Sequence, residues 1–337
     1  MQAPADNEPR FRPNTDHVES WFLRANDPQS ARAIWLKATV LCRSDGEAVA
    51  EAWCSLFDGD RTLGLRQTVP LSAATIDVGA ETLSIGIADL VMELAGQGAA
   101  SSGALSSPRG QVSWDLSFEP VPGALGEPLS LLPSRRLIDA PVPKNKLLTP
   151  FPVARFSGRI QWDGEVWDLG DWIGMQGHNW GAAHSPEYAW GQCVFTDVRG
   201  EPFAMVEGAS GRIELGPVTS PLLSMLTVRR DGREYRFDRL LDLWRQKPVI
   251  RFPEWTLRMS GPDGSASLRM QAQPDHMVCL GYDNPGGNRS HCLNSKTARV
   301  TLRVDPSNGD GFECVSENGG ALEFLQPDEE PRVQPVV

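Results

Sequence analysis

The stretch DLGDWIGMQGHNWGAAHSPEYAWGQCVFTD, residues 168–197, holds three Trp, two His and five Gly within thirty positions. Glycine inside an otherwise strand-like pattern marks a place where the backbone turns or where another group approaches it closely. Two interpretations follow. The stretch is either a rigid, aromatic-rich junction between strands of a β protein, or a site where the backbone lies against a ligand.

Short apolar–polar alternations bounded by turn residues lie on both sides of this stretch. HVESWFLRAN (17–26) alternates, and ARAIWLKATVLCR (31–43) is separated from AVAEAWCSLFD (48–58) by Ser44-Asp45-Gly46, which indicates a hairpin. The pattern predicts one helix only, in FDRLLDLWRQK (237–247), which Pro248 ends. Many short antiparallel strands with few helices predict an all-β protein made of barrels or sandwiches.

Composition shifts divide the chain into parts. We expect an N-terminal β domain over 16–120, a Pro-rich connector over 121–154 that repeatedly breaks any strand, and a C-terminal β domain over 155–325. The Ala/Ser/Gly-rich segment 96–110 is expected to be a flexible loop. The ends, 1–15 and 326–337, are polar or Pro-rich and are expected to be flexible.

Charge and cysteine usage exclude several classes of function. A net charge of −11 without a Lys/Arg cluster argues against nucleic-acid partners. Six scattered cysteines without a Cys-x-x-Cys indicate buried thiols rather than disulfides or zinc ligands. His178 and His184 lack a third residue at a suitable spacing, so we expect no metal, and the absence of nucleotide-binding motifs predicts no cofactor.

The chain has no apolar run of about 20 residues and begins without a secretion-signal pattern, so we expect a cytoplasmic protein without a transmembrane segment. Glu19, Lys37 and Glu51 are charged positions within otherwise apolar runs. They are either paired polar groups that line an interior or residues on the wet face of a sheet. Both interpretations remain open at this point.

The segment GMQGHNWG (174–181), with HVESWFLRAND near the start and the long Pro-rich connector, resembles the lipocalin-like hydratase family typified by carotenoid 1,2-hydratase (hydroxyneurosporene synthase). The Diels–Alderases are more distant members of that structural group. The resemblance implies two lipocalin-like β domains with an apolar cavity, and cofactor-free acid–base chemistry on a polyene or isoprenoid-type substrate. The His and Trp of the His-Asn-Trp motif, which the family needs for activity, correspond to His178 and Trp180.

The family's Tyr-x-Asp corresponds best to Met205 and Glu207, so the carboxyl group is retained and the phenol is not. If Arg199-Gly200 closes a two-residue hairpin, residues whose numbers sum to 399 face each other, which places Glu207 opposite Gln192 and Met205 opposite Val194. Trp190, Gln192 and Glu207 then share one face. Burial against Trp190, Trp180 and Met205 would raise the pKa of Glu207, as a general acid requires. The alternative is a solvated strand residue.

We therefore predict a catalytic set of His178, Trp180 and Glu207, and substrate contacts from Trp190, Gln192, Met205, Asn179 and Trp21. Two functions follow. The first is a cofactor-independent lyase or isomerase, hydratase- or cyclase-like, for an apolar small molecule; because such a substrate partitions into lipid, transient contact with a membrane surface is expected. The second is a non-catalytic carrier of a lipophilic ligand, which needs only an apolar cavity and a few polar anchors.

Overall fold

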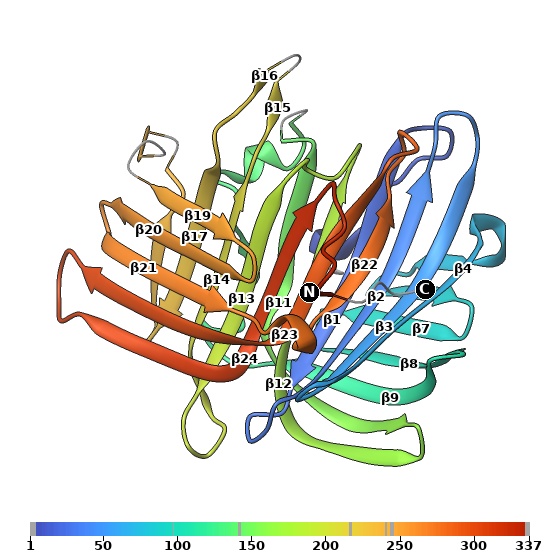
Figure 1. Ribbon diagram of the computed structural model, residues 1–337, viewed down its shortest axis with the longest axis horizontal. Coiled ribbons are helices and arrows are strands. Elements are labelled where there is room, and N and C mark those ends of the chain that lie inside the picture. Colours follow the sequence, from blue (N-terminus) through green and yellow to red (C-terminus); the bar gives the residue numbers. More distant parts are fainter. Residues whose placement is uncertain are drawn as a thin grey trace.

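The computed structural model describes residues 5–333 except 97, 141–142, 216–217, 240 and 243–245. Two large antiparallel sheets, each strongly curved, lie side by side (Figure 1). The first sheet contains, in spatial order, β4 (Arg61–Pro70), β3 (Ala48–Asp58), β2 (Arg32–Cys42), β1 (His17–Asn26), β12 (Glu165–Gly181), β11 (Asn145–Trp162), β9 (Gly110–Pro120), β8 (Gly98–Ser107), β7 (Leu90–Ala95), β6 (Thr82–Ile87) and β5 (Thr75–Val78), with β10 (Leu129–Ser130) on β11.

The second sheet contains β18 (Arg233–Phe237), β17 (Leu223–Arg230), β14 (Pro202–Gly211), β13 (Tyr188–Thr196), β24 (Phe312–Gln326), β23 (Arg289–Pro306), β21 (Gly264–Gln271), β20 (Glu254–Gly261) and β19 (Lys247–Arg251), with β22 (Val278–Asp283) on β23. A separate ribbon pairs β15 (Glu214–Leu215) with β16 (Val218–Thr219). Short 3₁₀ turns occur at η1 (Ala5–Asn7), η2 (Leu71–Ala73), η3 (Arg135–Leu137) and η5 (Pro274–His276). The predicted all-β class, with two antiparallel β units and few short helices, is confirmed.

Each sheet encloses its own apolar core, and a third cluster joins the two sheets. The first core gathers side chains such as Trp21, Trp114 and Phe156 on the inner face of the first sheet. The second is built around Trp255 and Phe324. The third takes members from both sheets, among them Phe22, Trp35, Trp53, Met175, Trp190, Leu280 and Tyr282. Successive side chains of a strand point to opposite faces, so one strand can contribute to the core of its own sheet and to the cluster between the sheets.

The strand that carries the His-Asn-Trp motif belongs to the first sheet. β12 pairs with β1 on one side and with β11 on the other, so residues 155–181 do not join the later strands as the sequence suggested. The chain passes from one sheet to the other over residues 182–187, between β12 and β13. The division into two domains with a connector stays a prediction.

Two segments that the sequence indicated to be irregular are strands. The whole of β8 lies within the Ala/Ser/Gly-rich segment, and it pairs with β7 and β9. The end of the Pro-rich connector forms the start of β11, which runs through Pro150 and Pro152. β11 accommodates these prolines with register shifts between Leu148 and Phe151 and between Phe151 and Ala154. Proline is tolerated at bulges because the ladder loses its hydrogen bond there in any case.

The described part of the N-terminal arm packs against the first sheet, and its flexibility stays a prediction. Asn7 is fully buried and exchanges two side-chain hydrogen bonds with Gln176, of 3.1 and 2.9 Å. The Trp21 indole donates to the Asn7 carbonyl oxygen at 2.9 Å. Residues 1–4 lie outside the described part. Near the other end, Val333 is buried against the second core, while 334–337 lie outside the described part.

Several further expectations can be compared with the structure. The predicted helix over 237–247 includes 240 and 243–245, which lie outside the described residues; Phe237 ends β18 and Lys247 begins β19. All six cysteines are free and buried, as predicted. Glu19, Lys37 and Glu51 are all buried, so they do not lie on a wet face of the sheet. No helix in the described part of the chain is long and apolar enough to cross a membrane.

Candidate functional site

His178 lies on the inner face of the first sheet, beneath the N-terminal arm. It faces Trp21 across the β1–β12 pair, and the two rings stack with centroids 5.0 Å apart. The Trp180 ring lies 4.8 Å away on the same face. His178 Nε2 bonds Glu19 Oε1 at 2.7 Å, and Nδ1 donates to the Asp6 carbonyl oxygen at 2.7 Å. The imidazole is therefore fixed by two partners and two aromatic rings.

Glu19 is the centre of this arrangement. Besides His178, its carboxylate accepts hydrogen bonds from the backbone N–H groups of Arg10 and Phe11, and His17 Nε2 lies 3.2 Å from Oε2. Burial acts to raise the pKa of Glu19, yet the hydrogen bonds from His17 and His178, the His178 charge and the Arg10 N–H outweigh it and lower that pKa. The group serves to attach the arm to the sheet.

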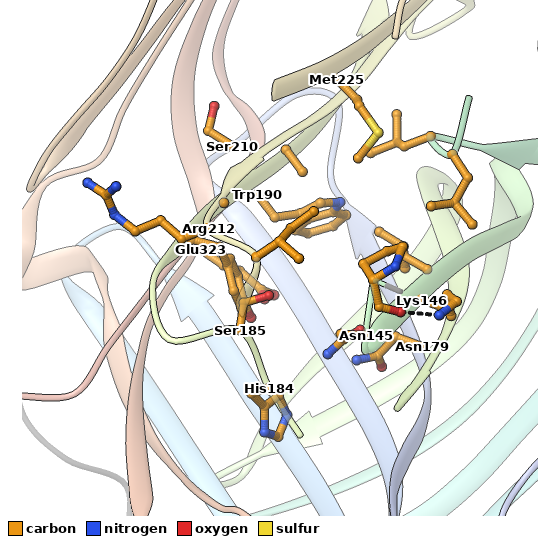
Figure 2. Close-up of a pocket in the computed structure, with 18 of the residues that line it drawn as sticks. Asn145, Lys146, Asn179, His184, Ser185, Trp190, Ser210, Arg212, Met225 and Glu323 are labelled. Atoms are coloured by element: carbon orange, nitrogen blue, oxygen red, sulfur yellow. Dashed lines mark hydrogen bonds between the residues drawn. The ribbon is translucent and has the colours of Figure 1, made fainter. Parts of the chain in front are cut away.

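A cleft opens on the other face of the first sheet, between the two sheets. It encloses about 1110 Å³ of empty space, part of which is open to solvent. Figure 2 shows Asn179, Trp190 and Met225 at its wall, with Lys146, Arg212 and His184 also around it. Apolar lining comes from both sheets and from the connector: Phe22, Trp35, Leu131, Leu132, Leu147, Ile213 and Leu223. Clefts lined mainly by apolar side chains with a few polar groups commonly bind small molecules.

Ionisable groups from both sheets also line this cleft or lie directly behind it. Glu323 lines it and accepts hydrogen bonds from Lys296 Nζ at 2.6 Å and from Asn294 Nδ2 at 2.9 Å. Lys37, from the first sheet, also lines the cleft. Burial lowers the pKa of Lys37 and of Lys296, although the Glu323 charge opposes the shift in both.

His184 stands beside this group, on the segment that links the sheets. Its Nδ1 bonds Asn284 Oδ1 at 2.8 Å, and its ring stacks on Tyr282 with centroids 5.2 Å apart. Burial, with a contribution from the Lys37 charge, lowers the pKa of His184 to about 4. Its buried Nε2 has no hydrogen-bond partner among the described residues. A neutral imidazole is thus present at the wall of the cleft near neutral pH.

The predicted register between β13 and β14 is confirmed. Gln192 pairs with Glu207 and Val194 with Met205, so Trp190, Gln192 and Glu207 share one face. The turn itself is longer than predicted: Asp197 N–H donates to the Glu201 carbonyl at 2.9 Å, and a register shift follows Phe195.

Glu207 is fully buried behind Trp190, whose ring lines the cleft. The Trp190 indole Nε1 donates to Glu207 Oε1 at 3.1 Å, and Thr149 Oγ1 lies 2.9 Å from both carboxyl oxygens. Burial raises the pKa of Glu207 to about 7, against the lowering effect of the Thr149 and Trp190 hydrogen bonds. A raised pKa was expected from the sequence. The apolar surroundings predicted for Glu207 are only partly present, because Trp180 lies on the other face of the first sheet.

The residues of the predicted site therefore separate into two groups. Trp21, His178 and Trp180 lie beneath the arm, with Trp180 in a cluster of Leu132, Ile138 and Leu148. Trp190, Gln192, Met205 and Glu207 face the region between the sheets, and Asn179 joins Trp190 at the cleft. Gln192 donates to the Pro152 carbonyl at 2.8 Å and accepts from Arg24, while Met205 packs on Val153 and Ile173.

Sequence reasoning did not assign Lys37, Lys296 and Glu323 to a site. The available signal was a charged residue within an apolar run, which singled out Lys37 but left its direction open. Two of the glycines do not support the interpretation that glycine lets the backbone lie against a ligand. A Cβ on Gly174 would lie 1.9 Å from the Arg24 carbonyl oxygen, and one on Gly177 would lie 2.4 Å from the Phe22 ring. Both positions admit a neighbouring strand rather than a ligand.

No cluster of three or more side chains suited to hold a metal ion occurs in the part of the chain that the structure describes. No protein-family model matches the chain. Two Mycobacterium tuberculosis proteins, including the uncharacterized protein Rv0493c of strain H37Rv, are 21% identical over 302 residues, which cover 88% of this chain and 84% of the relative. The similarity therefore spans most of this chain and most of each relative.

Three crystal structures are similar in fold. CghA has a TM-score of 0.58 at 11% identity and covers 98% of this chain and 97% of its own. Kievitone hydratase from Nectria haematococca has a TM-score of 0.56 at 10% identity, covering 94% and 90%. A protein assigned as AttH from Nitrosomonas europaea has a TM-score of 0.55 at 11% identity, covering 93% of each chain. At such identities the likeness shows the shared fold alone.

Proposed function

We propose that this protein is a cofactor-independent lyase or isomerase that moves a proton on an apolar small molecule bound between the two sheets. The observation that carries the proposal is the cleft itself, where aromatic and aliphatic walls meet a small set of ionisable groups. An apolar wall gives affinity, and a few polar groups fix orientation and supply chemistry. The substrate class is an isoprenoid or polyene, as the family resemblance implies.

Glu323 is the proton-transfer group in this proposal because it lines the cleft and comes from the rigid strand β24. Its hydrogen bonds to Lys296 and Asn294 fix the carboxylate, as a general base requires. As a base, Glu323 would take a proton from one carbon of the substrate and return it to another, so that the proton count is unchanged. The rings of Trp35 and Trp190, which line the cleft, would hold the apolar body of the substrate.

Glu207 has a different part here from the one that the sequence suggested. Its carboxyl group is enclosed by Thr149 and Trp190, so it positions the Trp190 ring rather than touching a ligand. His178 likewise fixes the arm, on the far face of β12. Both residues remain necessary for an intact site without being proton donors.

A carrier of lipophilic ligands is the second candidate function. It is favoured by the position of His178 and Glu207, since neither of the two predicted acid–base side chains lines the cleft. A carrier would bind the same class of molecule and release it unchanged. Because that molecule partitions into lipid, either function predicts pick-up at a membrane surface. Liposome flotation with and without ligand checks this contact.

The deciding experiment compares two matched variants. Native mass spectrometry of the protein purified from its own host identifies a co-purified molecule, which is then incubated with enzyme and analysed by liquid chromatography and mass spectrometry in D₂O. Glu323→Gln should lower turnover by at least about 10²-fold with little change in binding. Glu207→Gln should lower it far less. The reverse order would restore Glu207 as the acid, and an unchanged ligand with every form of the protein would establish the carrier.

A further inference from the structure

Within the described part of the chain, one lysine that lines the cleft, Lys37, has no salt-bridge partner. Lys37 is 5% exposed, and its Nζ lies 3.9 Å from the centre of the Tyr282 ring and 5.7 Å from that of Trp35. Among the residues that the structure describes, no side chain or carbonyl accepts a hydrogen bond from this amine. The other lysines at the cleft differ. Lys296 donates to Glu323, and Lys146 donates to the Pro143 carbonyl oxygen.

An amine in this position is costly to bury. An ammonium group carries three donors, and a buried charge is normally both paired and hydrogen-bonded. Aromatic faces compensate only part of that cost, about 2 kcal/mol in desolvated sites. The nearby carboxylate, Glu323, is already engaged by Lys296 at 2.6 Å. Lys37, at the cleft wall, and Lys296, buried behind it, thus have one carboxylate, Glu323, between them.

We infer that the ligand of this cleft carries one acidic oxygen group, a carboxylate or an enolate, which accepts hydrogen bonds from Lys37 Nζ. The inference rests on the proposed function for the cleft and adds the class of its ligand. The acidic group supplies the missing hydrogen-bond acceptor beside Tyr282, and the apolar body of the ligand extends along Phe22, Trp35 and Trp190. The unpartnered amine is the specific feature that a purely apolar ligand would leave unused.

A pair of probes with one polyene body isolates the head group. All-trans-retinoic acid and all-trans-retinol are titrated into the protein, and binding is followed by quenching of tryptophan fluorescence, because Trp35 and Trp190 line the cleft. The acid should bind at least about tenfold more tightly than the alcohol, as expected for hydrogen bonds to a charged group. Lys37→Met should remove this preference, which is read as the ratio of the affinities for the acid and the alcohol.

Lys146→Met is the matched control, since it removes a lysine at the same cleft whose amine already has an acceptor; it should leave the preference intact. Far-ultraviolet CD and thermal melting establish that each variant is folded. Equal binding of acid and alcohol by the wild-type protein overturns the inference without requiring any variant, and so does a preference that survives Lys37→Met. In both cases retinol binding keeps the proposed apolar cleft intact. If neither retinoid binds, the inference and the proposed function fail together.

Discussion

Trp190 separates Glu207 from the cleft between the sheets: its ring lines the cleft, and its Nε1 donates to Glu207 Oε1 at 3.1 Å. The carboxyl group is thereby removed from water without a full counter-charge. This enclosure, rather than contact with a ligand, accounts for the raised pKa of Glu207.

The first prediction concerns Glu207 and pH. With a folded-state pKa of about 7 against an ordinary value of 4.5, the folded protein retains a proton that the unfolded chain releases. The associated stability is fully present below about pH 4.5 and is lost as pH rises through about 7, by roughly 3 kcal/mol in all. Glu207→Gln should remove this contribution, because the amide still accepts from Thr149 and Trp190 and does not ionise.

Urea unfolding at pH 5 and pH 8 measures the effect as the difference in free energy of unfolding between the two conditions. The control is Glu119→Gln, an exposed carboxylate on β9, which should leave the pH dependence unchanged. A Glu207→Gln protein that loses as much stability as the wild type between these pH values would contradict the assignment.

The second prediction concerns the arm. Glu19 has a lowered pKa because it accepts hydrogen bonds from His17, His178 and the Arg10 N–H despite its burial. Its contribution to stability is present above the ordinary pKa of 4.5 and is lost as pH falls through the lower folded-state value. Glu19→Gln should therefore destabilise the protein at pH 7 by about 2 kcal/mol, within the range for hydrogen bonds to a charged group.

Thermal melting from pH 7 down to pH 3 checks this prediction. The difference between wild type and Glu19→Gln should narrow at the acid end, and hydrogen exchange of the Arg10 and Phe11 amides should accelerate in the variant. Glu8→Gln, an exposed neighbour on the same arm, is the control. Equal melting temperatures for wild type and Glu19→Gln at pH 7 would sink the idea that Glu19 anchors the arm.

The third prediction concerns Gly177. A Cβ at this position would lie 2.4 Å from the ring of Phe22. Phe22 is the cross-strand partner of Gly177 on β1, and it lines the cleft. Gly177→Ala should displace that ring and destabilise the protein by about 1–3 kcal/mol, as overpacking does. Urea unfolding measures the loss. Gly170→Ala, where a Cβ meets nothing within 4 Å, is the control on the same strand.

Properties that depend on neighbouring residues could be predicted from the sequence. Period-two alternation and turn residues indicated an all-β chain, and the spacing around the turn at 197–201 gave the pairing of Gln192 with Glu207. The same reasoning anticipated that burial would raise the pKa of Glu207. These features are local, since a hairpin brings its two strands together over a few residues.

Pairing between strands that are far apart in the chain follows only from the assembled fold. β12 joins β1, more than a hundred residues earlier, and no local pattern specifies that choice. Once β12 is placed, the alternation of side chains fixes their directions. Asn179 faces the cleft, so the neighbouring His178 must face the arm. Packing between the two sheets set Lys37 against Tyr282, whereas Lys296 and Glu323 meet across the successive strands β23 and β24. Side-chain direction is decided by the sheet, and the sheet is assembled from strands that the sequence keeps far apart.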